Sequence, residues 1–184
     1  PADADANAAL GGVSILFDWN AETAADAFKS AIAAGPNCGV AWMWYALVHM
    51  TLGDFEEALR CSIRAQTLES TLAINKVMTT WLLYLSGRPE EALAQVSAAI
   101  RQNPQIPRAY LYASWCYDML GRFDEALQTM QTCVALANFS AVRASLAYAY
   151  ARAGHRDEAR RFVHDLLESP AHTSPYWMAV AHMG

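Results

Sequence analysis

The sequence predicts an all-α fold, a solenoid of antiparallel helix pairs. Glycines recur at a nearly constant spacing, 34, 34 and 33 residues apart, at Gly53, Gly87, Gly121 and Gly154. Between these glycines, apolar residues follow one another at helical spacing, and no strand-like alternation appears. A self-similar period of this length is typical of repeat arrays, in which each unit buries its apolar face against its neighbours.

Each recurring glycine is expected to form the turn between the two helices of a pair, where the chain reversal needs a positive φ. Two acidic residues follow each glycine by three positions, and carboxylates in a first helical turn interact favourably with the helix dipole. These acidic pairs are Glu56-Glu57, Glu90-Glu91, Asp124-Glu125 and Asp157-Glu158. The second helix of each pair is therefore expected to begin directly after the turn.

Alanine recurs five residues after each of these glycines, at Ala58, Ala92, Ala126 and Ala159. Small side chains at a repeated position indicate a place where helices approach closely. A bulky residue there would push the neighbouring helices apart. These alanines are therefore predicted to be buried.

The chain resembles the tetratricopeptide repeat family over nearly its whole length, in its period and its glycine-x-aromatic-x-x-alanine phrase. Trp42 and Tyr110 stand at the aromatic position of the first helix. The resemblance implies a right-handed superhelical solenoid and makes residues 1–184 a single array. Its repeats would cover 5–38, 39–72, 73–106, 107–139 and 140–172, with a partial sixth helix at 174–184. We expect the chain to be a fragment of a longer protein.

Some positions depart from the family pattern. The first repeat has Asp18-Trp19-Asn20 where the others have the turn glycine. Lys76 and Arg143 occupy the position of the first-helix aromatic in the third and fifth repeats.

A weaker resemblance links the chain to the repeat tails of bacterial multidomain transcriptional regulators. It rests on Asp18-Trp19 in the first turn and on Ser174-Pro175-Tyr176 at the start of a late helix. It implies an alternative function: a regulatory or sensory tail of a transcription regulator or kinase, acting by docking or dimerisation.

The composition limits the partners. The chain is 54% hydrophobic and 17% charged, with a net charge of −5, and no basic stripe suggests direct contact with nucleic acid. No apolar run is long enough for a membrane helix, and no leader segment is visible. The four cysteines are widely spaced, so free buried thiols are favoured over two disulfides, which is consistent with a cytoplasmic protein.

The resemblance implies a function in protein–protein interaction, because first helices in this family line a groove that holds a peptide or partner domain. The groove positions here are Met43, Leu47, Val77, Trp81, Tyr84, Arg108, Leu111, Trp115, Asp118, Tyr148 and Arg152. Aromatic, methionine and arginine side chains are enriched at interface cores. Two interpretations remain open: these aromatics anchor a partner, or they pack on one another or on a terminal helix. Self-association through the groove or the C-terminal helix is a further option.

Several site types are not expected. The apolar residues Met43, Leu47 and Val77 cannot form the basic clamp with which some family members grip a carboxylate. No nucleophile elbow, phosphate loop or metal-type histidine spacing occurs, so neither an enzyme nor a cofactor or metal is predicted. His49 is expected to be a hydrogen-bonded imidazole in the core.

Overall fold

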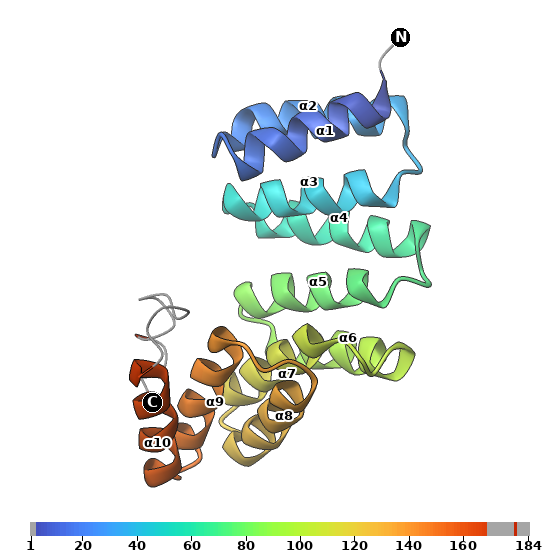
Figure 1. Cartoon of the computed structure of the whole chain (residues 1–184). Helices are drawn as coiled ribbons and strands as arrows, with labels where there is room; N and C mark the ends of the chain where they lie inside the picture. Colours follow the sequence, from blue (N-terminus) through green and yellow to red (C-terminus); the bar gives the residue numbers. More distant parts are fainter. Residues whose placement is uncertain (1–2, 169–178, 180–184) are drawn as a thin grey trace. The chain divides into compact units, whose positions relative to one another are not determined.

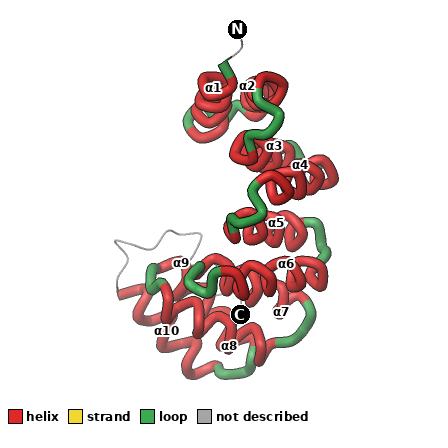
Figure 2. Tube along the Cα trace, turned by 90° about the vertical axis from the view of Figure 1, so that its right-hand side faces the viewer, coloured by secondary structure: helices red, strands yellow, loops and turns green. Residues whose placement is uncertain are grey.

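The computed structural model describes residues 3–168 and residue 179. Within these residues the chain forms ten α-helices and no strand (Figures 1 and 2). The helices are α1 (Ala4–Leu16), α2 (Ala21–Ala34), α3 (Gly39–Thr51), α4 (Phe55–Leu68), α5 (Ala73–Leu85), α6 (Pro89–Gln102), α7 (Pro107–Met119), α8 (Phe123–Leu136), α9 (Ser140–Arg152) and α10 (Arg156–Glu168). The expectation of an all-α repeat solenoid is confirmed, while the predicted sixth first helix at 174–184 lies almost wholly outside the described residues.

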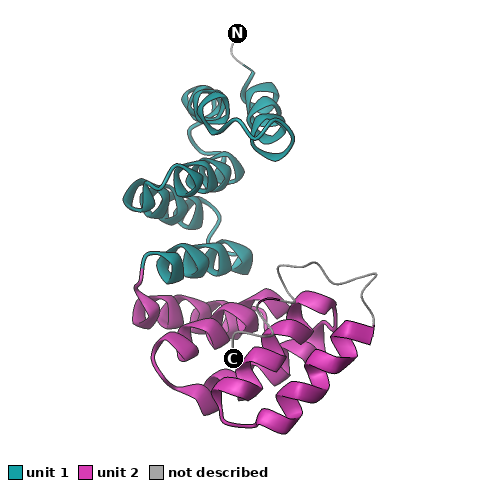
Figure 3. Ribbon diagram, turned by 90° about the vertical axis from the view of Figure 1, so that its left-hand side faces the viewer, with its two compact units in different colours: residues 1–86 teal, residues 87–184 magenta. Residues whose placement is uncertain are grey.

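The chain divides into two compact units, residues 1–86 and residues 87–184 (Figure 3). The first unit holds α1 to α5, and the second holds α6 to α10. Inside each unit, helices adjacent in sequence pack together, as in the pairs α1/α2, α3/α4, α7/α8 and α9/α10. Even-numbered helices also pack on the next odd-numbered helix, for example α6 on α7 and α8 on α9.

The four recurring glycines all adopt positive φ angles between 71° and 86°, so their predicted role as turn residues is confirmed. The first turn keeps the same backbone conformation without glycine, because Trp19 has a φ of 53°. A side chain in this left-handed region costs free energy, which the glycines avoid.

The second helices start in two ways. Asn20 and Asp54 cap α2 and α4, where their side-chain oxygens accept hydrogen bonds from backbone N–H groups three residues ahead. Arginine takes the equivalent place before α6 and α8, and no side chain caps these two helices. Arg88 and Arg122 instead bind the glutamates three residues ahead, which are Glu91 and Glu125.

The departure from the aromatic pattern at Lys76 has a structural explanation. Trp42 Nε1 donates a hydrogen bond to the carbonyl of Pro36, six residues earlier, at 2.9 Å. The hydroxyl of Tyr110 donates the equivalent bond to the carbonyl of Pro104 at 3.1 Å. Lys76 Nζ donates one to the carbonyl of Ser70 at 3.2 Å, again six residues earlier. A donor that reaches the preceding loop is therefore common to three repeats. Arg143 differs, because its guanidinium lies 3.8 Å from Asp165.

The core of the first unit is built from small and aromatic side chains. Phe28 is completely buried between α1 and α3, with Ala24 and Val48 beside it. The ring of Phe28 stacks parallel to that of Trp44, with 6.3 Å between the ring centroids. A second cluster joins α3, α4 and α5 through Ala46, Ala58, Cys61 and Leu82.

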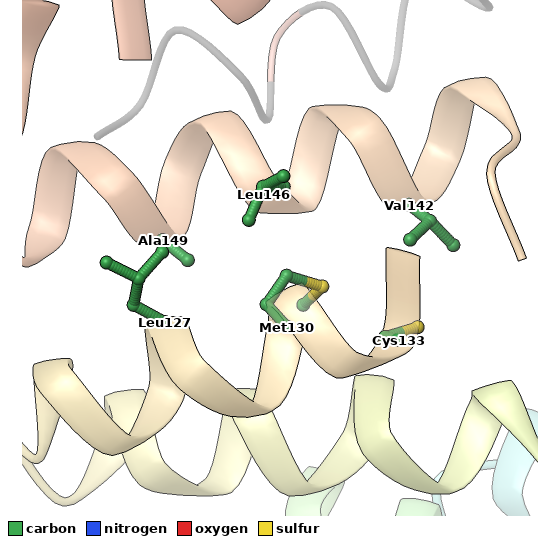
Figure 4. Close-up of a cluster of buried hydrophobic side chains, with 6 residues drawn as sticks. All are labelled: Leu127, Met130, Cys133, Val142, Leu146 and Ala149. Atoms are coloured by element: carbon green, nitrogen blue, oxygen red, sulfur yellow. The ribbon is translucent and has the colours of Figure 1, made fainter. Parts of the chain in front are cut away.

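One core cluster of the second unit lies between α8 and α9 (Figure 4). Met130 and Leu127 of α8 face Leu146 and Ala149 of α9 in this cluster, which Cys133 and Val142 complete. The alanines five residues after the turn glycines are all buried, with at most 6% of their surface exposed, as predicted. Close helix packing therefore depends on these positions.

The cysteines agree with the prediction from the sequence, and His49 does not. All four cysteines are free thiols, and three of them, Cys61, Cys116 and Cys133, are buried. The expectation of a hydrogen-bonded His49 is wrong. Neither ring nitrogen of His49 has a hydrogen-bond partner, although Nδ1 lies 3.5 Å from a carboxylate oxygen of Asp54. The imidazole packs edge-on against Tyr45 at 4.5 Å, so contact with an aromatic ring holds it in place.

In the described part of the chain, every helix is too short to be a membrane span.

Candidate functional site

The predicted groove residues of the first unit lie on α3 and α5. Met43 and Leu47 are half-buried on α3, and Trp81 and Tyr84 are half-buried on α5. Val77 requires a correction, because it is completely buried and has no surface to offer a partner. We therefore remove Val77 from the candidate site and assign it to the core.

The predicted groove residues of the second unit lie on α7 and α9. Leu111, Trp115 and Asp118 follow one another at helical spacing on α7, so they share one face of that helix. Tyr148 and Arg152 share one face of α9. We call these five residues the α7–α9 face. Contacts between α7 and α9 bring the two helices together. Arg108, also predicted, is exposed one turn before Leu111.

Two contacts join the polar members of the α7–α9 face. The hydroxyl of Tyr148 donates a hydrogen bond to Asp118 Oδ2 at 3.0 Å, and Arg152 Nε donates one to Asp118 Oδ1 at 2.9 Å. The bond to Asp118 raises the pKa of the Arg152 guanidinium above its usual value. Both carboxylate oxygens of Asp118 thus have donors, and the charges of Asp118 and Arg152 offset each other.

Phe123 belongs to this cluster and was not predicted. The guanidinium of Arg152 lies over the ring of Phe123, 4.5 Å from its centroid, and over the ring of Tyr148 at 5.9 Å. Such cation–π contacts hold the guanidinium in one orientation. Phe123 was missed because it stands two residues after a turn glycine, at a position that the repeat pattern assigns to the scaffold.

The apolar members of the α7–α9 face are supported by the core. Leu111 and Trp115 are half-buried and pack against the cluster between α8 and α9. The rings of Trp115 and Tyr112 lie 5.4 Å apart, tilted by 42°. Trp115 is therefore fixed by the core cluster and Tyr112, while part of its surface remains exposed. This placement combines both sequence-based interpretations, since the ring packs internally and also reaches the surface.

The α7–α9 face offers an indole, a leucine and an ion pair whose charges offset each other. Among residues 3–168 and 179, no group of three or more histidine, cysteine or acidic side chains could hold a metal ion. Burial raises the pKa of Cys116 to about 12 and that of Cys61 and Cys133 to about 11, so these thiols are uncharged at neutral pH.

Comparison with protein families gives two matches. One tetratricopeptide repeat model matches residues 20–61 and 81–141, and a second tetratricopeptide repeat model matches residues 140–165. No curated protein matches the chain.

Several solved structures have the same fold. A thermophilic tetratricopeptide repeat protein from Thermus thermophilus is 24% identical, with a TM-score of 0.75, over 90% of this chain and 91% of that protein. A MamA fragment from Desulfovibrio magneticus RS-1, from position 41 to the end, is 17% identical, with a TM-score of 0.75, over 90% of this chain and 93% of that fragment. YrrB, described as having an unusual peptide-binding site, is 17% identical, with a TM-score of 0.65, over 90% of this chain and 86% of YrrB.

Proposed function

Because this chain belongs to the tetratricopeptide repeat family, we propose that it is a scaffold for protein–protein interaction that binds a partner segment on its α7–α9 face. The observation that carries the proposal is the placement of Trp115. Its ring rests on Tyr112 and on the core cluster, yet the side chain is only half-buried. A rigid, partly exposed aromatic residue loses little conformational entropy on binding and contributes strongly to interfaces.

The paired charges beside Trp115 support the same proposal. Asp118 is held by Tyr148 and Arg152, so a partner can cover the carboxylate without leaving it unpaired. Burying an unpaired charge at an interface costs several kcal/mol, and pairing it beforehand reduces that cost. The surface therefore presents apolar and aromatic groups beside a polar cluster that is already satisfied.

The chemistry of the partner follows from the surface. Leu111 and Trp115 favour an apolar side chain, and this face carries no free basic pair for a terminal carboxylate. A helix or an extended segment with apolar anchors fits the surface. The regulatory-tail alternative would use the same face, with the partner being a domain of the same polypeptide.

Hydrogen–deuterium exchange tests where a partner binds. A library of random peptides displayed on phage supplies a binder for the full chain, and exchange is then compared with and without the synthetic peptide. We expect slower exchange in α7 and α9. Slower exchange confined to other helices would contradict the proposed face.

A further inference from the structure

A pocket opens between α6, α7 and α8, on another side of α7 from Trp115. Its volume is about 220 Å³, and its α7 wall consists of Tyr110, Ala113 and Tyr117. Ala113 and Tyr117 stand two residues after Leu111 and Trp115, which corresponds to about 200° around a helix. The pocket and the α7–α9 face therefore use different sides of α7.

The walls of the pocket are uncharged. Leu93 and Ile100 of α6 are half-buried and offer apolar surface to it, and Val96 of α6, also in the lining, is completely buried. Polar but neutral side chains complete the lining, namely Ser97, Gln128, Thr129 and Thr132. Gln128 and Thr132 are exposed, so the pocket is reachable from solvent. A volume of this size is below that of sites for whole small molecules, about 300–1,000 Å³, and suits a single large side chain.

Small residues line the pocket from two helices. Ser97 and Ala113 face it from α6 and α7. The register of the repeats places Ile63 and Thr79 at these positions in the junction of α4 and α5, and Gln131 and Leu146 in the junction of α8 and α9. Larger residues thus stand at both positions in the other two junctions.

Acidic residues stand one helical turn before the pocket lining on both α6 and α8. Glu90 lies one turn before Leu93 on α6, and Asp124 lies one turn before Gln128 on α8; both are exposed. Arg122 stacks on the ring of Tyr117, but its charge is offset by the ion pair with Glu125. Arg101, one turn beyond Ser97, is a single cation at the other end of α6.

We propose that this pocket is a second docking site, which holds one bulky apolar side chain of a protein segment that also carries a cation beside that side chain. The apolar lining receives the side chain, and Glu90 and Asp124 attract the cation. This site is separate from the α7–α9 face, so its failure would leave the proposed function untouched.

A peptide probe tests the proposal by NMR titration of the full chain. The probe is acetyl-Arg-Ala-Ala-Leu-Ala-Ala-Arg-amide, which presents a cation on either side of the leucine, so that the direction of binding does not matter. Two matched peptides replace the leucine with alanine or both arginines with glutamate. We expect the amide signals of Ser97, Thr129 and Thr132 to shift with the first peptide, and at least fivefold weaker binding of each matched peptide.

Variants show whether the pocket itself binds. Ser97→Ile introduces the residue of the α4/α5 junction and fills the space, and it should weaken binding at least tenfold. Ser97→Ala leaves the space open and should keep the affinity, as should Trp115→Ala. Glu90→Gln with Asp124→Asn should abolish the preference for arginine over glutamate. Absence of shifts in the wild type, or equal binding by Ser97→Ile and Ser97→Ala with both folded by circular dichroism, would overturn the proposal.

Discussion

Arg152 and Asp118 join two successive repeats through a hydrogen bond of 2.9 Å, although 34 residues separate them in sequence. The anion and the cation thus lie on neighbouring first helices, one local period of 33 residues plus one residue apart. The pair is partly exposed, with 40% of the Arg152 side chain and 19% of the Asp118 side chain accessible. It orders the polar part of the α7–α9 face before any partner arrives.

A double-mutant cycle measures the strength of this link. Arg152→Ala, Asp118→Ala and the double variant are unfolded in urea, and the coupling free energy is calculated from the four stabilities. Since the pair is partly exposed, we expect a coupling of about 0.5–1 kcal/mol at low salt, falling as salt is added. A coupling of zero would show that the two side chains do not stabilise the junction.

The first turn provides a test of backbone strain. Trp19 has a φ of 53° and is 86% exposed, so its replacement by glycine relieves strain while removing little packing. We expect Trp19→Gly to raise the free energy of unfolding by about 0.5–1 kcal/mol, after the greater flexibility of glycine in the unfolded chain is counted.

The matched variant is Gly121→Ala, at a φ of 71° where an added Cβ meets no atom within 4 Å. This variant should have a free energy of unfolding about 1 kcal/mol lower than that of the wild type, through backbone strain alone. If Trp19→Gly were destabilising, packing of the indole would outweigh the strain at the first turn.

Ala92 tests the close approach of helices in the second unit. It is completely buried, so Ala92→Trp should destabilise the fold by about 1–3 kcal/mol or more through overpacking. Ala94→Trp, on the exposed side of the same helix, serves as the control and should change the melting temperature little. Equal melting temperatures for the two variants would remove Ala92 from the packed interface.

The buried thiols predict a loss of stability in alkali. Burial favours the neutral thiol and raises the pKa of Cys116 to about 12, from an ordinary value of 9.0. The stabilising contribution is therefore complete below about pH 9 and is lost as the pH rises toward 12, because the unfolded chain releases the proton first.

Urea unfolding at pH 8 and pH 10 under reducing conditions measures this effect. From pH 8 to pH 10, we expect the free energy of unfolding of Cys116→Ala to fall by about 1.4 kcal/mol less than that of the wild type. This difference corresponds to one pKa unit. The same pH dependence in both proteins would argue against a neutral buried thiol at this position.

The helices and turns were predictable from the sequence because each turn and each close helix contact restricts the residue at one position. A turn with positive φ favours glycine, and a close helix contact favours alanine, so both leave a periodic signal. Trp19 and Lys76 broke that signal while the structure kept the same turn and the same bond to the preceding loop. Backbone conformation can thus persist where the usual residue is absent.

The candidate site was less predictable because depth and pairing depend on neighbouring helices. Helical spacing placed both Val77 and Trp115 on the predicted groove, yet Val77 is completely buried while Trp115 is half-buried. The link from Asp118 to Tyr148 and Arg152 depends on the distance between α7 and α9, which spacing along one helix does not contain. Ser97 and Ala113 look like ordinary small residues until the register of the repeats shows that they meet at one junction.

The central claim is that Trp115 anchors a partner segment on the α7–α9 face. The most direct test is the dissociation constant of a phage-selected peptide for the wild type and for Trp115→Ala, measured by isothermal titration calorimetry. Arg161→Ala, on the exposed surface of α10, is the control. We predict a loss of about 30-fold or more for Trp115→Ala, equivalent to about 2 kcal/mol, with the control unchanged. An unchanged dissociation constant in a folded Trp115→Ala protein would contradict the account.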